Sequence, residues 1–418
     1  MAGMAVRGLG GKRTIMDKRQ EMLSKTAYGC FYAGIIIEVL MVVIDKSEYI
    51  NPVEGRMFQL TFLLFLIKVF FTKYSVKEYG IMALFFILGG ISYFVTGRNE
   101  MVRLVMLVAA CKGIDIKKCL KLIFYLTLSG CAVLILLSVS GIYGAVSLTM
   151  DFGRGSEETR YMLGLGHPNA LQCMVWALTV LFLYLFGEKM KWYSYLFIVA
   201  VNGLFFYLTD SKTSLMVAVF AILYTGVMVL VKNDIFRKVC CVGGGLLCLA
   251  SIALSVIIAA NAYRVYYYYW HWDWSEVTEI FLRLDNALTG RIHSLVGTDR
   301  WEGTIGTWSL FSEPANDYFF DFGWIRLFYW YGIVPAVIFI LAMLCLMIYC
   351  TKKKDYLAVV LITAFAVYSF SEAHGISVYL ARNYVFFLMG AYWNKMFCAA
   401  SERECYWWKL PALIKEKV

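Results

Sequence analysis

Apolar runs of about 20 residues follow one another along this chain and constrain its fold more than any other feature of the sequence. A helix needs roughly 20 apolar residues to cross the hydrocarbon core of a bilayer, which is about 30 Å thick. Lipid offers the backbone no hydrogen-bond partner, so such runs must form helices. With 61% hydrophobic and 16% charged residues among 418, the chain is predicted to be an all-α polytopic membrane protein.

The runs predict about 12 transmembrane helices. We expect helices 1–9 within residues 27–261, one large loop at 262–321, and helices 10–12 within residues 322–400. Residues 1–26 and 401–418 are the expected terminal tails. The expected spans are 27–44, 56–72, 79–96, 99–111, 119–146, 168–187, 192–209, 213–231, 239–261, 322–350, 356–372 and 383–399.

Lysine and arginine set the expected orientation. They gather in both tails and in alternate short loops, including 112–121, 188–191 and 351–355. Cytoplasmic loops carry this excess, so both termini are predicted to be cytoplasmic in the plasma membrane, and the loop at 262–321 extracytoplasmic. The net charge of +10 is spread over these loops, which indicates contact with anionic membrane lipids and no nucleic acid partner.

The cysteines and the charged residues within spans add two expectations. None of the 12 cysteines falls in an expected outside loop, so we expect no disulfide framework, and no spacing indicates a metal site. Charges within or beside a span are costly and are functional candidates. Glu38 and Lys68, in the first two spans, are expected to form a structural pair. Five further polar clusters all map to the expected outer face.

The first cluster, "RYMLGLGHPNALQ", occupies residues 160–172 at the start of a span. Its glycines allow close backbone approach, and its proline suits the first turn of a helix, whose free N–H groups favour an anion. Arg160 and His167 could face a phosphate there, with Asn169 at the helix start. The alternative is a capped helix start in which Gly-His-Pro-Asn forms only a turn.

The second cluster, "YLTDSKTSL" at 207–215, is a short turn between two apolar runs. Its tip carries Asp210, Ser211 and Lys212. Ser211 and Lys212 are candidates for contact with the same phosphate. The alternative is that Asp210 or Ser211 caps a helix while Lys212 extends to the lipid headgroups.

The third cluster lies in the long loop, as "LRLDNALTGRIHSLVGTDRWEG" at 282–303. Arg283, Arg291 and Arg300 present planar forks that match phosphate and stay protonated at pH 7. They therefore indicate a site that holds an anion. The aromatic run at 263–274 fits either an interfacial belt or stacking on sugar rings.

The fourth and fifth clusters combine carboxylates with cations near the same face. They are "EPANDYFFDFGWIRLFYWYG" at 313–332 and "SFSEAHGISVYLARN" at 369–383. Such groups suit general acid–base work, although interfacial ion pairs are an equal alternative. The titratable residues of interest in them are Asp317, Asp321, Arg326, Glu372, His374 and Arg382.

In this order, the clusters resemble those of the bacterial polysaccharide polymerases of the O-antigen polymerase and O-antigen ligase family, often called Wzy. "RYMLGLGHPNALQ" looks like the family's Arg followed by Gly-aromatic-Gly-His-Pro-Asn, "YLTDSKTSL" like its Thr-x-Ser-Arg-Thr turn, and "RLDNALTGRIH" like its Asn-x-x-Ser/Thr-Gly-Arg stretch. "ANDYFFDFGWIRLFYWYGIVP" and "SFSEAHGISVYLARN" match its later motifs. The likeness extends over about residues 90–390, with Leu165 in place of an aromatic and Lys212 in place of arginine.

The resemblance implies a metal-independent glycosyltransferase that needs no cofactor and uses undecaprenyl diphosphate as its substrate carrier. It would move a growing glycan onto the next lipid-linked oligosaccharide repeat at the outer membrane face, for capsule, exopolysaccharide or O-antigen synthesis, with a chain-length regulator as a partner. The candidates for accepting a proton are His167, Glu372, Asp317 and His374. The candidates for binding diphosphate or glycan are Arg160, Asn169, Ser211, Lys212, Arg283, Arg291, Tyr318 and Arg382.

Two other functions stay open on the sequence. A ligase that transfers finished glycan to another acceptor would need the same donor site. A 12-span transporter or flippase fits less well, because major-facilitator carriers have a long cytoplasmic segment after span six. Here that link is only "EKMK", and the one long segment follows span nine.

Overall fold

The computed structural model describes residues 4–152, 155–271, 275–296, 302–398 and 403–411. Helices dominate these residues, and two small antiparallel sheets pair β1 (Tyr74–Ser75) with β4 (Glu404–Cys405) and β2 (Ser147–Asp151) with β3 (Glu157–Tyr161). The α-helices are α1 Met4–Asp45, α2 Glu54–Phe70, α3 Val76–Thr96, α4 Glu100–Ala110, α5 Ile116–Val139, α6 Pro168–Phe186, α7 Trp192–Thr209, α8 Lys212–Leu230, α9 Asp234–His271, α10 Glu276–Ala287, α11 Gly323–Tyr331, α12 Ile333–Lys352, α13 Tyr356–Tyr368 and α14 Tyr384–Phe397.

Within the described part of the chain, eight helices are long and apolar enough to cross a membrane. This confirms a helical, membrane-embedded protein. Four of the twelve expected spans are shorter: α2 has 17 residues, α4 has 11, α13 has 13 and α14 has 14. At about 1.5 Å per residue, the length of α4 is only about half of the hydrocarbon thickness of a bilayer. The eight spans are Gln20–Asp45, Val76–Thr96, Ile116–Val139, Pro168–Lys189, Trp192–Thr209, Lys212–Leu230, Asp234–Tyr269 and Ile333–Lys352.

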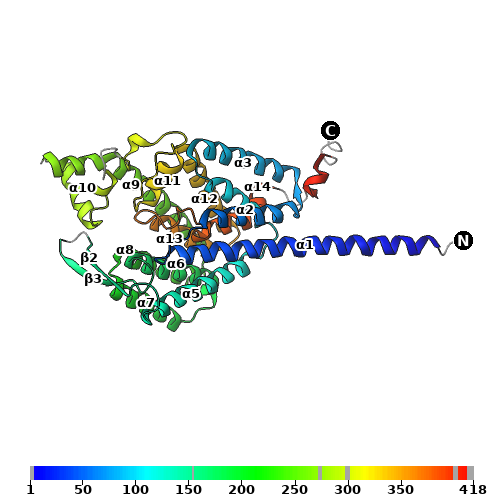
Figure 1. Ribbon diagram of the computed structural model, residues 1–418, viewed down its shortest axis with the longest axis horizontal. Helices are drawn as coiled ribbons and strands as arrows, with labels where there is room; N and C mark the ends of the chain where they lie inside the picture. The colour runs from blue at the N-terminus through cyan, green and yellow to red at the C-terminus, as the bar shows by residue number, and fades with distance from the viewer. Residues whose placement is uncertain (1–3, 153–154, 272–274, 297–301, 399–402, 412–418) are drawn as a thin grey trace.

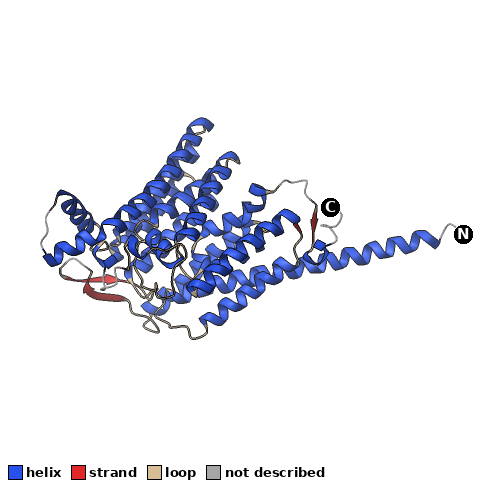
Figure 2. Cartoon of the chain, turned by 90° about the horizontal axis from the view of Figure 1, so that it is seen from above, coloured by secondary structure: helices blue, strands red, loops and turns tan. Residues whose placement is uncertain are grey.

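The helices form one bundle from which the first part of α1 projects (Figures 1 and 2). Both chain ends lie at this end of the molecule, whereas α10 and the β2–β3 hairpin lie at the other. All of α13 except Val367 is buried, so this helix lies in the interior of the bundle. Other helices expose large apolar side chains such as Phe94 and Leu230, as expected for surfaces that face lipid.

The charged residues inside the bundle pair differently from our expectation. Glu38 contacts Arg103, with 3.1 Å between Oε1 and Nη2, and accepts a hydrogen bond from Thr61 at 2.7 Å. The predicted pair between Glu38 and Lys68 is therefore wrong. The periodicity of an apolar run does not show at which height two helices pack together or which of their faces meet. In the structure, α4 brings Arg103 against Glu38 of α1.

Several boundaries also differ from the sequence prediction. The expected tenth span is two helices, α11 and α12, because Gly332 at φ 93° ends the first. A Cβ atom at Gly332 would lie 2.6 Å from the Cα atom of Phe311, so the close approach of these two backbone segments requires glycine. Helix α9 continues to His271, and α10 occupies part of the expected loop. The end of the aromatic run, 272–274, and Arg300 lie outside the described residues.

Candidate functional site

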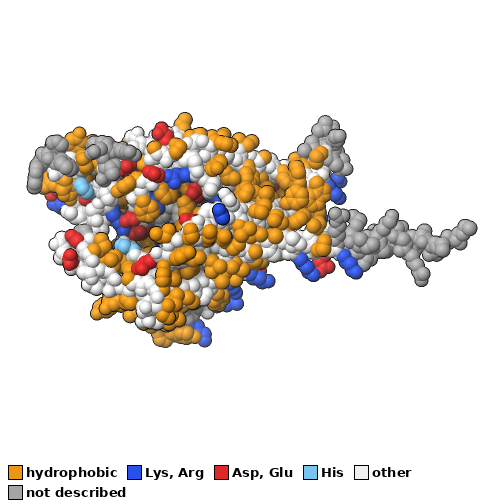
Figure 3. Space-filling model, viewed as in Figure 1, with side chains coloured by type: hydrophobic (Ala, Val, Ile, Leu, Met, Phe, Trp, Pro, Cys, Tyr) orange, Lys and Arg blue, Asp and Glu red, His pale blue; other side chains and the backbone are white. Residues whose placement is uncertain are grey.

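A hollow opens at the end of the molecule near α10 and the β2–β3 hairpin, and lysine or arginine, acidic and histidine side chains gather in it (Figure 3). The surrounding surface in that view is largely hydrophobic. Charged groups beside apolar helices are costly unless they are paired or bind a ligand. Ion pairs join side chains from all five polar clusters that the sequence singled out.

Arg291 makes three polar contacts through its guanidinium. Its Nη2 atom lies 2.6 Å from Oε1 of Glu372, and its Nε atom lies 3.2 Å from Oδ2 of Asp321. Its Nη1 atom donates to the carbonyl of Ser371 at 2.7 Å. The Arg291 side chain is 12% exposed and that of Glu372 13%, whereas Asp321 is 42% exposed. One carboxylate of this cluster is therefore enclosed and the other is accessible to solvent.

The local sequence builds a turn that presents Arg291. Thr289 and Gly290, at φ 55° and 78°, reverse the chain after α10. The buried carboxylate of Asp285 accepts hydrogen bonds from the backbone N–H groups of Ile292 at 2.7 Å and His293 at 3.0 Å. Asp285 was not among the predicted site residues, and it lies four residues before Thr289 in the sequence.

Glu372 lies in the loop that follows α13, where burial changes its acidity. Burial raises the pKa of its carboxyl to about 7, and the Arg291 guanidinium opposes this increase. A carboxyl with this pKa exchanges protons readily near neutral pH. Geometry and acidity together therefore favour Glu372 among the four candidates for accepting a proton.

His167 caps the start of α6, as the structural alternative for the first cluster predicted. Its Nδ1 atom accepts a hydrogen bond from the backbone N–H of Asn169 at 3.1 Å, and Pro168 takes the first helical position. Burial lowers the pKa of His167, Asp321 opposes this effect, and Arg160 and Lys46 add to it. The charges of Asp321, Arg160 and Lys46 therefore act on the imidazole of His167 that caps α6.

Arg160 lies on β3, opposite Leu148 of β2. Its guanidinium is 2.7 Å from Oε2 of Glu158 and 3.5 Å from Oδ2 of Asp210, and it stacks on Phe152 with 4.0 Å to the ring centroid. The side chain is only 8% exposed. The hairpin thus links the first and second clusters through one buried guanidinium.

In the turn between α7 and α8, Asp210 at φ 51° caps the end of α7 and donates its backbone N–H to the carbonyl of Phe206 at 2.7 Å. The alternative of a capped turn is therefore confirmed for Asp210. Ser211 precedes α8 but accepts no side-chain capping bond, and its hydroxyl lies 3.3 Å from that of Ser214. Ser214 in turn lies 2.8 Å from the hydroxyl of Tyr368 on α13. Lys212 is exposed. The structure therefore directs Ser211 into the protein interior and Lys212 outward.

His374 is buried beside α6. Its Nδ1 atom lies 3.0 Å from the sulfur of Cys173, and its ring meets Trp176 edge to face at 5.9 Å. Burial lowers the pKa of His374 to about 3, so the ring stays neutral and is a weak base at neutral pH. This environment suits a packing role better than proton transfer.

Arg382 connects the last polar loop to the end of α1. It contacts the carboxylate of Asp45, donates to the hydroxyl of Ser377 at 3.0 Å and lies over Tyr379. Lys46 is the next residue after Asp45 in the chain, and its charge lowers the pKa of Glu372. Asp45 and Lys46 stand at the end of the first apolar run and are not among the predicted site residues.

Three candidates do not join this cluster. Arg283 on α10 has a side chain that is 79% exposed and pairs with Glu279 of the same helix at 2.6 Å. Asp317 is exposed. Tyr318 is half-buried and contributes its carbonyl to the indole N–H of Trp330 at 3.1 Å.

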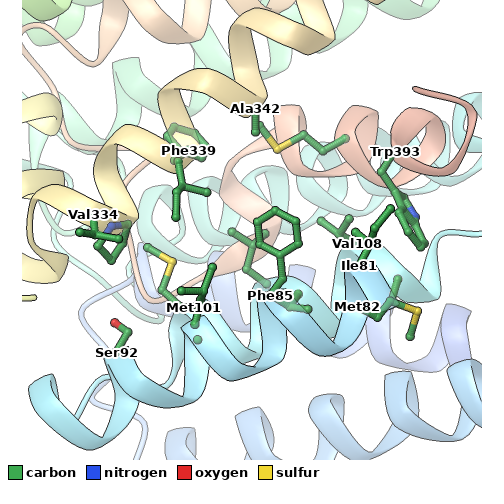
Figure 4. Close-up of a pocket in the computed structure, with 18 of the residues that line it drawn as sticks. Ile81, Met82, Phe85, Ser92, Met101, Val108, Val334, Phe339, Ala342 and Trp393 are labelled. Carbon is green, nitrogen blue, oxygen red and sulfur yellow. The ribbon is translucent and has the colours of Figure 1, made fainter. Parts of the chain in front are cut away.

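An apolar pocket of about 170 Å³ lies between α3, α4, α12 and α14 (Figure 4). Its walls include Phe85, Met101, Phe339 and Trp393. Met101 and Phe339 also line a smaller cavity that reaches Gly375, directly after His374 in the chain. The apolar interior therefore approaches the loop that carries Glu372.

Among the residues that the structure describes, no group of three or more His, Cys, Asp or Glu side chains could hold a metal ion. We compared the chain with protein-family models, with curated proteins and with solved structures, and none of the three comparisons found a match.

Proposed function

We propose that this protein polymerises lipid-linked oligosaccharide repeats, moving a growing glycan from undecaprenyl diphosphate onto the next repeat. The observation that carries the proposal is the cluster of Arg291, Glu372 and Asp321, in which the side chain of Asp321 is 42% exposed. A lipid carrier brings its diphosphate to the headgroup level of the bilayer. A guanidinium with one displaceable carboxylate suits the binding of such a group.

The proposed topology has twelve spans, counting the shorter helices, with both termini cytoplasmic and the hollow on the outer face of the plasma membrane. The excess of lysine and arginine in the tails and alternate loops supports this orientation. The partners are then the lipid-linked oligosaccharide, membrane lipids and a chain-length regulator. Neither a metal nor another cofactor takes part in this scheme.

In the proposed reaction, a hydroxyl oxygen of the acceptor sugar attacks the anomeric carbon of the donor. The bond from that carbon to the diphosphate oxygen breaks, and its electron pair leaves with the diphosphate. Glu372 accepts the proton of the attacking hydroxyl, since its pKa is raised to about 7. Arg291 stabilises the charge of the departing diphosphate, with Arg160 as a second cation beside the hollow.

The polyprenyl tail of the donor needs an apolar surface close to the diphosphate site. The pocket between α3, α4, α12 and α14 offers such a surface, and it shares Met101 and Phe339 with the cavity that reaches Gly375. This arrangement supports lateral access of a lipid substrate to the Glu372 loop.

The test compares Arg291→Ala with Arg283→Ala in proteoliposomes supplied with lipid-linked repeats. Removing a group that stabilises transition-state charge costs about 10²–10³-fold in rate, so we expect this loss for Arg291→Ala. The matched control, Arg283→Ala, removes an exposed arginine and should stay within about twofold of the wild-type rate. Product length is read on gels as a ladder attached to the carrier lipid.

Equal rates for the wild type and Arg291→Ala, at equal amounts of folded protein, would contradict the proposed site. A wild-type protein that forms no ladder but transfers glycan to a different acceptor would instead identify a ligase. Movement of unaltered lipid-linked repeats across the vesicle membrane would identify a flippase.

A further inference from the structure

A second polar cavity lies at the opposite end of the bundle, near the point where α1 projects and where both chain ends lie (Figure 1). Its volume is about 680 Å³. The walls come from α1, the end of α2, the turn after α4, the end of α14 and the C-terminal segment. The polymerase mechanism proposed above uses no residue of this cavity.

Lys68 supplies a buried cation to the cavity wall. Its side chain is 3% exposed, and its ammonium donates to the hydroxyl of Thr72 at 2.8 Å and to the carbonyl of Lys112 at 3.0 Å. The ring of Tyr28 lies 5.4 Å away. All three neighbours are neutral, and among the described residues no ion pair joins Lys68 to a carboxylate. Burying an ammonium without a counter-charge is costly.

Lys112, in the same wall, shows the ordinary solution to this problem. It contacts Glu78 at 2.6 Å and Glu404 at 2.9 Å, so two carboxylates compensate its charge. Of the two carboxylates that line the cavity, Glu404 pairs with Lys112 and Asp115 pairs with Lys118 at 3.6 Å. The charged lining comprises Lys68, Lys73, Lys112, Lys395, Asp115 and Glu404, four cations against two anions.

We propose that this cavity binds a phosphate group, with Lys68 as its buried cation. Phosphate supplies several acceptor oxygens and at least one negative charge, which match the unused ammonium proton and the excess of lysine. The phosphate can come from the headgroup of an anionic phospholipid or from free phosphate in solution. Both sources share the chemistry that Lys68 recognises, and experiment can distinguish them.

The test measures thermal unfolding of the purified full-length protein under three conditions. The first uses nanodiscs of phosphatidylcholine, the second adds phosphatidylglycerol to the same nanodiscs, and the third adds inorganic phosphate to protein in detergent. We expect anionic lipid or phosphate to raise the unfolding temperature of the wild type in a concentration-dependent manner. A rise with phosphatidylglycerol only identifies a lipid headgroup, whereas a rise with inorganic phosphate shows that the phosphate group suffices.

Lys68→Met removes the charge and keeps much of the side-chain volume. Losing one side of a buried charge pair should weaken phosphate binding by about thirtyfold or more. Lys68→Gln, which keeps polar contacts to Thr72 and Lys112, serves as the second variant if the first does not fold. The matched control is Lys353→Met, at an exposed lysine that does not line the cavity.

Three results would overturn the proposal. One is a wild-type protein whose stability responds to neither anionic lipid nor phosphate. Another is a Lys68 variant that keeps the full response, and the third is an equal loss of response in Lys353→Met. Because the readout is stability and not glycan transfer, failure here leaves the polymerase proposal unaffected, and the reverse also holds.

Discussion

Arg103 and Arg291 both hold a buried carboxylate, but their surroundings differ. Arg103 and its partner Glu38 have side chains that are 5% and 1% exposed, and the ring of Phe58 lies 3.7 Å from the Arg103 guanidinium. Arg291 and Glu372 lie near the surface, and Asp321 is 42% exposed. The first pair is enclosed by α1, α2 and α4. In the second cluster Asp321 is accessible, and under the proposed function a substrate anion would replace it beside Arg291.

This difference indicates that residue types alone do not separate a structural ion pair from a candidate site. Both pairs consist of one arginine and one glutamate in an apolar protein. What distinguishes them is access: Asp321 of the Arg291 cluster is 42% exposed, and the pKa of Glu372 is raised to about 7. The two clusters should therefore respond differently to mutation.

The largest expected effect on stability comes from breaking the enclosed pair. Arg103→Leu leaves Glu38 without its cation inside the bundle, which should lower the free energy of unfolding by about 3–5 kcal/mol. Chemical denaturation in detergent micelles measures this loss. Replacing both residues by leucine should recover most of it, because no unpaired charge remains. Equal losses in the single and double variants would show that the pair is not the cause.

Mutation of the more accessible pair, Arg291 and Glu372, should change the rate of glycan transfer more than the free energy of unfolding. Glu372→Gln keeps a hydrogen bond to Arg291 but cannot accept the hydroxyl proton, so the rate of glycan transfer should fall about 10²–10⁴-fold. The comparison variant Glu38→Gln should lower stability while the rate per folded molecule changes little. Polymerisation assays normalised to folded protein test both statements. The reverse pattern, with Glu38 controlling rate, would refute the distinction drawn here.

The pH dependence follows from the raised pKa of Glu372. The carboxyl must be ionised to act as a base, so the rate should rise with pH and level off above about 7, with about a hundredfold lower rate at pH 5. The sign for stability is opposite. The folded pKa exceeds the ordinary 4.5, so this group stabilises the protein at low pH and loses that contribution as the pH rises through about 7.

Rate profiles of the wild type and of Glu372→Gln between pH 5 and 8 measure this effect. The variant should have a low rate with a flat profile over this interval. An unchanged slope in Glu372→Gln would assign the titrating group to another residue, with His167 as the next candidate.

The sequence predicts helices well where an apolar run is bounded by polar or capping residues. The expected span 192–209 matches α7, and 168–187 ends within one residue of α6. The prediction fails where glycine interrupts apolar sequence, as at Gly332, or where a polar turn interrupts it after Val139. Apolar composition alone cannot show such a break, since close backbone packing and not hydrophobicity requires it.

The candidate site was predictable in part. The order and types of the residues indicated Arg160, Arg291 and Glu372, and in the structure each takes part in a contact between an arginine and a carboxylate. Nothing in the sequence could show that Arg283, eight residues before Arg291, points to solvent. The turn held by Asp285 decides which arginine enters the cluster, and that turn depends on contacts formed only in the folded chain.

Arg160 offers the finest test of the comparison, because its environment is intermediate. Its guanidinium is 8% exposed, like an enclosed pair, but its carboxylate partners Glu158 and Asp210 are 32% and 33% exposed. Arg160→Lys keeps the charge and loses the planar fork that reaches both carboxylates. We expect a stability loss of about 1 kcal/mol and a rate loss of about tenfold, each smaller than at the two extremes. Denaturation and polymerisation assays on the same preparation measure both. A loss of stability alone would group Arg160 with Arg103, whereas a loss of rate alone would group it with Arg291.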